Sequence, residues 1–192
     1  MKRIGITGGI GSGKTYIASV FQSFRIPIFN ADIQAKKVMT SSRKLIKVVK
    51  EEFGNDIYKD SDLNKEKLAS IVFSNSDKLQ KLNSLVHPIV KEEFNNWYMK
   101  QTSPYVIKEA AILFESNSHI ELDAVICVSA PLDLRIKRLL IRDDYSDNEI
   151  KKRIDNQISQ EKKEKLSDYI IVNDEKELLL PTIIKIHKEL LS

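Results

Sequence analysis

The chain contains few of the residues that cross-link or bend a polypeptide. Of its 192 residues, six are glycine, five are proline and only one, Cys127, is cysteine. A single cysteine excludes an intrachain disulfide, which is typical of proteins from a reducing compartment. Because Cys127 lies in the apolar run 125–128, we expect a buried core thiol rather than a nucleophile.

Long apolar runs are also missing. No stretch approaches the roughly 20 apolar residues that are needed to span a bilayer. The first residues lead at once into an apolar segment and a glycine-rich stretch, so no signal peptide is expected. We therefore expect a cytoplasmic protein that has no membrane partner.

The chain has no large excess of either charge. It carries 31 basic and 27 acidic residues, a net charge of +4 and a pI near 9.0. Most basic residues alternate with acidic ones, which is typical of solvated helix faces, and few aromatic residues lie among them, so we expect no nucleic-acid partner. A small positive excess suits a small anionic substrate.

Five of the six glycines lie within the first thirteen residues. The stretch Gly8–Thr15, read as Gly-Gly-Ile-Gly-Ser-Gly-Lys-Thr, matches the phosphate-binding loop pattern of Gly, four residues and Gly-Lys-Ser/Thr. It follows a mostly apolar segment, Arg3–Thr7, and precedes residues 15–24, where apolar residues recur at the spacing of a helix. The pattern therefore lies between an expected strand and an expected helix, where a phosphate-binding loop must lie.

The residue types of this loop follow from the chemistry of a polyphosphate. Glycines let the backbone come close to the ligand, and successive N–H groups together with the helix N-terminus form an anion site. The sequence therefore predicts ATP binding by a set of consecutive loop residues: Ile10, Gly11, Ser12, Gly13, Lys14 and Thr15. The Lys14 ammonium is expected to reach the β- and γ-phosphates, and the Thr15 hydroxyl to ligate Mg²⁺.

Short apolar segments alternate with helical patterns along the rest of the chain. The five expected strands are 3–7, 27–29, 105–108, 124–128 and 169–172. The pattern predicts an α/β fold of the P-loop NTPase type, with a parallel five-stranded sheet flanked by helices. Helices are expected after Asp32 and over residues 43–53, 64–73, from 77 onward, 89–100 with Pro88 in its first turn, 131–142, 147–165 and 175–191.

The spacing of the strands also predicts the domain organisation. About 65 residues separate the expected helix of Asp32 from the third strand, too many for a simple crossover. We therefore expect a single chain with three parts: a nucleotide-binding core (1–32, 103–132 and 166–192), a helical substrate-binding lobe (33–102) and a further helical part (133–165).

Ligands of such sheets bind at the carboxyl ends of the strands. Asp32 follows the second strand and is a candidate to accept a hydroxyl proton or to orient a metal-bound water, although it could equally serve only to cap a helix. Arg135, Arg138 and Arg142 recur at helical spacing after the fourth strand, where they form either a phosphate-facing cluster or a solvated face. Because this helix is expected to start directly after the carboxyl end of the fourth strand, the phosphate-facing cluster is favoured.

Two other classes of phosphate-loop protein are excluded by missing motifs. Beyond the first strand and the loop the only glycine is Gly54, with Glu51 three residues before it, so a GTPase Asp-x-x-Gly is absent. Residues 64–67 fail the Asn-Lys-x-Asp pattern at its last position, and no glycines remain for a transport-ATPase signature. A kinase of a small metabolite needs none of these.

Several further segments share one family pattern. They are Thr7–Thr15, the Asn-Ala-Asp-x-x-Ala-Lys-x-Val segment 30–38, Leu-x-His-Pro at 85–88, Ala-Ile-Leu-x-Glu at 111–115, the Arg-x-x-x-Arg-Asp of 138–143 with Gln157, and Ser-Asp-x-x-Ile-x-Asn at 167–173. In this ordered set the chain resembles the dephospho-coenzyme A kinase family along nearly its whole length.

The resemblance implies a reaction and several residue roles. It implies ATP-dependent phosphorylation of the ribose 3′-hydroxyl of dephospho-coenzyme A, the last step of coenzyme A biosynthesis, with Mg²⁺ as cofactor. It assigns the role of a closing lid to the helical part 133–165, and it places Asp32, Lys36 and His87 at the acceptor, Arg138 and Arg142 in that lid, and Asn173 near the adenine. On sequence alone His87 could instead bond at a helix start. We expect a monomer or a weak homo-oligomer.

Three departures from the family pattern carry consequences. Asn30 replaces the first aspartate, so a base role there is lost and falls to Asp32. Lys36 replaces an arginine, which keeps the charge but not the bidentate geometry. Ala111 replaces a proline, and nearby Glu109 follows a strand, so it either holds magnesium through water or forms a structural ion pair.

Two rival functions stay open at this stage. One is phosphorylation of another nucleoside, nucleotide or small hydroxylated metabolite. The other is a nucleotide-dependent binding switch, which binds ATP without turning over an acceptor.

Overall fold

The computed structural model describes residues 1–59, 62–73, 75–142 and 146–192. The chain divides into two compact units. The sheet unit contains Met1–Asn30 and Gln101–Ser192, and the helical unit contains Ala31–Lys100.

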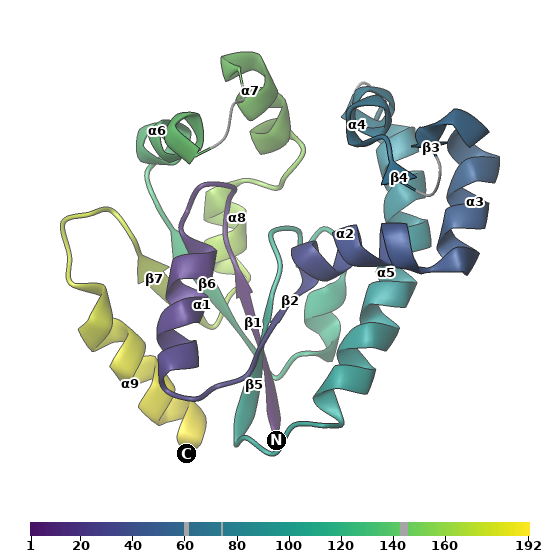
Figure 1. Cartoon of the computed structure of the whole chain (residues 1–192). Coiled ribbons are helices and arrows are strands. Elements are labelled where there is room, and N and C mark those ends of the chain that lie inside the picture. The colour runs from purple at the N-terminus through teal and green to yellow at the C-terminus, as the bar shows by residue number, and fades with distance from the viewer. Residues whose placement is uncertain (60–61, 74, 143–145) are drawn as a thin grey trace. The chain divides into compact units, whose positions relative to one another are not determined.

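The sheet unit is built on five strands that run in parallel in the order β2-β5-β1-β6-β7 (Figure 1). Their bounds are β1 (Lys2–Thr7), β2 (Ile28–Asn30), β5 (Tyr105–Glu109), β6 (Ala124–Ser129) and β7 (Tyr169–Val172). The predicted parallel five-stranded sheet is confirmed. Since all five strands point the same way, the segments that follow them gather at one edge of the sheet.

The helices of the sheet unit are α1 (Lys14–Ser23), α6 (Leu132–Arg142), α7 (Asp147–Asp155), α8 (Gln160–Lys165) and α9 (Leu179–Leu191), with a short 3₁₀ turn, η2 (Ser118–Glu121). Helices α1 and α9 pack against the same face of the sheet, where Ile4, Ile126, Phe21 and Ile183 share one core. All four side chains are fully buried, and burial of a side chain of this size contributes roughly 1.5–3 kcal/mol.

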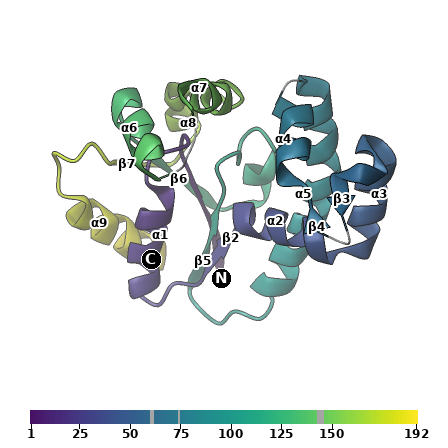
Figure 2. The same ribbon diagram turned by 45° about the horizontal axis from the view of Figure 1, so that its top comes forward.

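The other face of β6 meets α8. Side chains alternate along a strand, so Cys127 points away from the core that contains Ile126 and Val128. Its sulfur accepts a hydrogen bond from Gln160 Nε2 at 3.3 Å. Helices α6, α7 and α8 lie together beside the loop that joins β1 to α1, as Figure 2 shows.

The helical unit consists of α2 (Ala31–Ser41), α3 (Arg43–Phe53), η1 (Asn55–Ile57), the antiparallel pair β3 (Tyr58–Lys59) and β4 (Asp62–Leu63), α4 (Lys65–Phe73) and α5 (Ser76–Tyr98). In α3 the Ser42 hydroxyl caps the helix by accepting from the Leu45 N–H. Leu45, Val49 and Phe53 recur every fourth residue and form its buried stripe.

Helix α5 corrects the prediction of two helices divided at Pro88. The helix runs unbroken from Ser76 to Tyr98 with Pro88 inside it. Proline removes one backbone donor and disfavours a helix interior, but Leu82, Val86, Val90 and Phe94 form one buried stripe across the proline. Packing along that stripe therefore outweighs the local penalty. His87 consequently lies inside a helix, and the alternative that it bonds at a helix start is wrong.

Two further helix predictions are wrong at their bounds. The expected helix 147–165 is two helices, because the chain leaves α7 after Asp155 and restarts where the Ser159 hydroxyl accepts from the Lys162 N–H. The last helix begins at Leu179 instead of 175. Among the described residues, no helix has the length and apolar content required for a membrane crossing.

Candidate active site

The phosphate-binding pattern folds as a loop between β1 and α1. Gly13 is the N-cap of α1 with φ 91°, and Gly11 has φ 81°. Both angles lie in the left-handed region that residues with a Cβ rarely adopt. The N-terminus of α1 therefore opens onto the loop, and its partial positive charge favours an anion there.

Lys14 begins α1, and its side chain folds back over the loop. Its Nζ donates to the carbonyl oxygens of Gly8 at 3.2 Å and Gly9 at 3.1 Å, and the residue is only 8% exposed. A buried ammonium requires acceptors, and a charged phosphate oxygen is a stronger acceptor than a peptide carbonyl. The side chain is therefore held inside the loop and suited to a phosphate.

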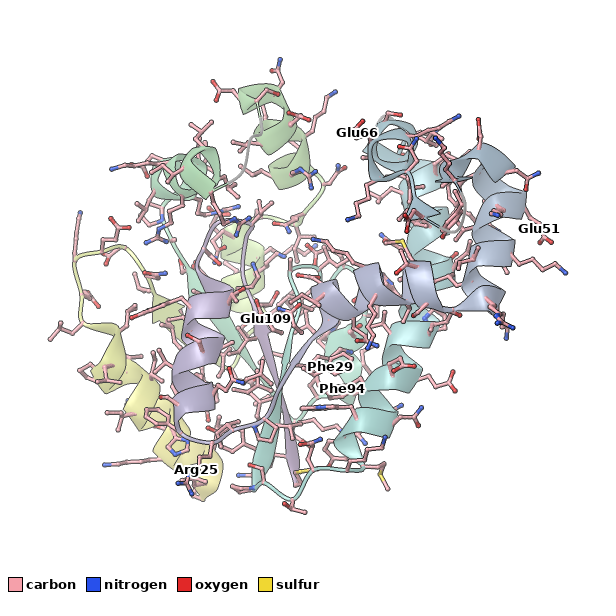
Figure 3. All side chains as sticks on the ribbon, viewed as in Figure 1. Arg25, Phe29, Glu51, Glu66, Phe94 and Glu109 are labelled. Atoms are coloured by element: carbon pink, nitrogen blue, oxygen red, sulfur yellow. The ribbon has the colours of Figure 1, made fainter. Side chains whose placement is uncertain are left out.

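Oxygen ligands lie beside the start of α1. Thr15 Oγ1 donates to Glu109 Oε1 at 2.6 Å, and Asn30 Nδ2 donates to Glu109 Oε2 at 2.7 Å. Glu109, which Figure 3 labels, is 3% exposed and ends β5. Asn30 thus has a structural role that an ionised aspartate could not fill, because a carboxylate has no hydrogen to donate to Glu109, whereas the amide does.

These oxygens fit a magnesium ion. Mg²⁺ prefers hard oxygen ligands and is commonly held by one or two protein groups together with substrate phosphates. The hydroxyl of Thr15 and the buried carboxylate of Glu109 supply such ligands next to the phosphate loop. Over residues 1–59, 62–73, 75–142 and 146–192 no group of three or more His, Cys, Asp or Glu forms a ready-made metal cage.

Helix α6 packs directly on the loop through Arg135. Arg135 Nε donates to the Ile10 carbonyl oxygen at 2.9 Å, and the residue is 5% exposed. A Cβ at Gly9 would lie 2.3 Å from the guanidinium carbon, so any other residue there would force the Arg135 side chain to shift. Burial lowers the pKa of the Arg135 guanidinium and the Glu161 carboxylate opposes the shift, but arginine stays charged at neutral pH.

Three amide side chains contact the same loop. The N–H groups of Gly9 and Ile10 donate to Gln160 Oε1 and Gln157 Oε1, each at 2.9 Å. Asn173 follows β7 and is buried, and its Nδ2 donates to the Ser12 carbonyl oxygen at 2.8 Å. The predicted adenine contact of Asn173 stays a prediction, and its partner in the structure is the loop.

The two predicted lid arginines lie one helical turn apart on α6. Arg138 Nη2 donates to the Asn173 carbonyl oxygen at 3.2 Å and pairs with Glu175 at 2.9 Å. Arg142 is exposed at the last residue of the helix. The structure therefore brings Arg138 together with Asn173, and the catalytic roles of Arg138 and Arg142 stay predictions.

The residues predicted at the acceptor all belong to the helical unit. Asp32 lies in the first turn of α2, Lys36 is exposed one turn later, and His87 is half-buried in α5. Because Asp32 lies inside the helix and not before it, it can act on the helix end as a first-turn acid. The acceptor roles of these three residues stay predictions.

A buried ion pair ties α8 to the segment after β5. Lys163 Nζ lies 2.9 Å from Glu115 Oε1 and donates to the Ala111 carbonyl oxygen at 2.6 Å. Lys163 is fully buried, and the Ile158 N–H also donates to Glu115. The pair fixes the segment from which Gln157 and Gln160 reach the loop.

The sequence did not reveal the contact of Gln160 with the loop, because Gln160 opens a charge-rich stretch that is typical of solvent exposure. The favoured prediction placed Arg135 in a phosphate-facing cluster, because α6 begins after the carboxyl end of β6. In the structure Arg135 contacts the Ile10 carbonyl oxygen of the loop. Gln157 was noted only through the family resemblance.

A parallel sheet with a glycine-rich loop after its central strand, a lysine in the loop and a hydroxyl at the helix start defines a P-loop nucleotide-binding protein. Within that class, the comparisons with known proteins agree. The sequence model of the dephospho-CoA kinase family matches residues 2–178. This chain therefore belongs to the dephospho-CoA kinase family.

Individual relatives are similar over most of their length. The chain is 35% identical to a dephospho-CoA kinase of Bacteroides fragilis over 185 residues, covering 96% of this chain and 90% of the relative. A crystal structure from Thermus thermophilus superposes with a TM-score of 0.84 at 28% identity, covering 99% and 96% of the two chains. The dephospho-CoA kinase of Campylobacter jejuni gives 0.67 at 25% identity, covering 97% and 96%.

Proposed function

We propose that this chain transfers the γ-phosphoryl group of ATP to the ribose 3′-hydroxyl of dephospho-CoA, giving CoA and ADP. Membership of the dephospho-CoA kinase family supports the enzyme class and both substrates. The single observation that carries the chemistry is the complete loop, in which Lys14 is buried over the peptide carbonyls and Thr15 is joined to Glu109.

The loop residues bind and orient the triphosphate. The Gly11–Thr15 N–H groups and the Lys14 ammonium would face charge on the phosphates, while the Ile10 N–H is paired with Gln157. Electrostatic stabilisation of this kind dominates phosphoryl transfer. Magnesium, when bound, neutralises charge on the β- and γ-oxygens. Thr15 would ligate it, and Glu109 would hold Thr15 and a metal-bound water in place.

The acceptor side is assigned to the helical unit. Asp32 lies two residues beyond the last residue of β2. The carboxyl end of β2 is at the same sheet edge as the loop. We propose that it receives or orients the proton of the 3′-hydroxyl. Lys36 and His87 would bind the acceptor, while Arg138 and Arg142 would offset charge on the transferring group and help exclude water.

A coupled ADP-release assay with a panel of acceptors tests the proposal. With ATP and Mg²⁺, dephospho-CoA is expected to give rapid ADP release and a product phosphorylated at the 3′ position, as read by ³¹P NMR. Adenosine, AMP and shikimate, at equal concentration, are expected to give little release. Preferred turnover of one of these, or ATP binding with no acceptor turnover, would contradict the proposed function.

A further inference from the structure

The loop is held by side chains from three separate segments of the sheet unit. Each segment supplies a partner to a peptide group of the loop. We call these four residues the loop clamp: Arg135, Gln157, Gln160 and Asn173.

The clamp matches donors to acceptors along the loop. The two loop N–H groups, of Gly9 and Ile10, meet glutamine carbonyl oxygens at 2.9 Å. The two loop carbonyl groups, of Ile10 and Ser12, meet the donors Arg135 Nε at 2.9 Å and Asn173 Nδ2 at 2.8 Å. Ile10 is therefore held at both its N–H and its carbonyl.

The side-chain amide of Gln160 is fixed by its own neighbours. Gln160 Nε2 donates to Glu164 Oε1 at 3.1 Å and lies 3.4 Å from the Val128 carbonyl oxygen and 3.3 Å from Cys127 Sγ. Glu164 in turn accepts from the Ser129 hydroxyl at 2.5 Å. The side chain of Gln160 is thus anchored to β6 on one end and to Gly9 on the other.

Close packing supports the same interpretation. A Cβ at Gly9 would lie 2.3 Å from the Arg135 guanidinium, and a Cβ at Gly11 would lie 2.6 Å from the Arg135 carbonyl oxygen. A Cβ at Gly13 would lie 2.3 Å from Asn173 Nδ2. Three of the loop glycines are therefore in direct contact with clamp residues, so the clamp and the loop backbone form one packed layer.

We propose that the clamp is a positioning device for the proposed reaction: its side chains fix the peptide groups of Gly9, Ile10 and Ser12 and so orient the remaining amides toward the phosphates of the nucleotide. Gln157, Gln160 and Arg135 are positioning residues that act through the loop. A preorganised set of donors loses little free energy on reordering when the anion binds. Loss of one partner leaves a loop N–H unpaired, which favours rearrangement of the loop.

A different interpretation is that the glutamine oxygens occupy places that phosphate oxygens take when ATP binds. The two interpretations predict opposite effects. If a glutamine oxygen occupies a phosphate position, it competes with the nucleotide, so loss of that oxygen tightens ATP binding or leaves it unchanged. If the glutamine instead holds the loop in place, loss of its oxygen weakens ATP binding.

Gln157→Met tests the clamp, because methionine has a similar length and volume but no oxygen acceptor for the Ile10 N–H. We expect the Kd for ADP, measured by calorimetry, and the KM for ATP to rise about tenfold, while the KM for dephospho-CoA stays within about twofold. Amide exchange of Ile10, followed by NMR, is expected to accelerate. Gln22→Met, on the exposed surface of α1, is the matched control and is expected to leave all four quantities unchanged.

Gln157→Glu provides the rescue, because it restores an oxygen acceptor. Its added charge is screened at about 0.5 M salt, where the Debye length is only a few ångströms. There we expect the ADP Kd to return to within about threefold of the wild type. An unchanged or tighter ADP Kd in Gln157→Met, or an equal rise of both KM values, would overturn the clamp.

The inference rests on the proposed function but fails separately from it. ADP affinity and Ile10 exchange report on the clamp whichever acceptor the enzyme uses. If dephospho-CoA is not phosphorylated, the proposed function fails while both readouts still decide the clamp.

Discussion

The two units of the chain bury different kinds of side chain. The buried polar residues of the described chain all lie in the sheet unit: Thr7, Ser12, Lys14, Lys108, Glu109, Arg135, Lys163 and Asn173. The buried side chains described in the helical unit are all aliphatic or aromatic, such as Leu45, Val86 and Phe94, and Figure 3 labels Phe94 and Glu109 as one example from each unit.

This difference distinguishes a site from a scaffold. A buried polar group costs free energy unless its partners are in place. The paired members of this set form an arranged network, whereas the Thr7 and Ser12 hydroxyls have no hydrogen-bond partner in the described residues. Most of that network lies on or beside the phosphate loop. The helical unit is held by apolar packing, and its candidate residues Asp32, Lys36 and His87 are at least partly accessible, as suits groups that meet a diffusing acceptor.

The largest effect is expected from Lys14→Ala, which removes the cation of the loop. Transition-state charge on the phosphates loses its main protein partner, so kcat/KM is expected to fall by roughly 10³-fold or more. Steady-state kinetics measures the loss. Lys188→Ala, at an exposed position of α9, is the control; near-normal activity of Lys14→Ala would remove the loop from the mechanism.

Asp32→Asn tests the helical unit by itself. A lost proton acceptor is expected to lower kcat by roughly 10² to 10⁴-fold, while the ADP Kd stays nearly unchanged because the loop is intact. Asp77→Asn is the matched control, since Asp77 is the first-turn acid of α5. If Asp32→Asn loses only about 1 kcal/mol of stability with normal kcat, Asp32 serves only the helix end.

Lys163→Met tests whether the buried polar groups of the sheet unit need their partners. It leaves the Glu115 carboxylate without its cation, and the free energy of unfolding is expected to fall by about 3 kcal/mol in denaturant titrations.

Leu45→Ala, in the apolar core of the helical unit, is expected to lower the free energy of unfolding by a similar amount, roughly 2–5 kcal/mol, because it leaves a cavity. The contrast appears when a second substitution is added to Lys163→Met. Adding Glu115→Leu to Lys163→Met is expected to restore part of the loss, since an apolar pair often replaces a buried ion pair. No restoration would mean that the loss comes from packing alone.

The smallest effect concerns Cys127 and pH. The pKa of this thiol is raised from 9.0 to about 11, mainly because the thiol is buried. The folded state therefore retains its proton where the unfolded state loses it, so the stabilisation is complete below pH 9 and is lost as the pH rises from 9 to 11.

Over that window the stability of the wild type relative to Cys127→Ala is expected to fall by about 2 kcal/mol. Chemical denaturation at several pH values measures it. A difference between the two proteins that does not change with pH would show that the thiol is not held neutral by the fold.

The sequence predicted the sheet unit well because its signals are local. Apolar strands and the Gly8–Thr15 pattern need no knowledge of distant contacts, and parallel connectivity places the strand ends at one edge. The five-stranded sheet and the family were confirmed. The roles of Asp32, Arg138 and Arg142 stay predictions.

The errors arose where distant packing decides local structure. Pro88 was read as a helix start, but the stripe from Leu82 to Phe94 carries α5 through it. Residues 156–159 contain neither glycine nor proline to mark a break, yet the chain turns there and Gln157 reaches Ile10, 147 residues earlier. A side chain that pairs across such a separation leaves no periodic pattern in the sequence.

The most direct measurement is a crystal structure with a non-hydrolysable ATP analogue, Mg²⁺ and dephospho-CoA. The account predicts the terminal phosphate within hydrogen-bond reach of Lys14 Nζ, with the 3′-hydroxyl between that phosphate and the Asp32 carboxylate. Phosphates bound away from residues 10–15, or an acceptor hydroxyl that Asp32 does not contact, would contradict it.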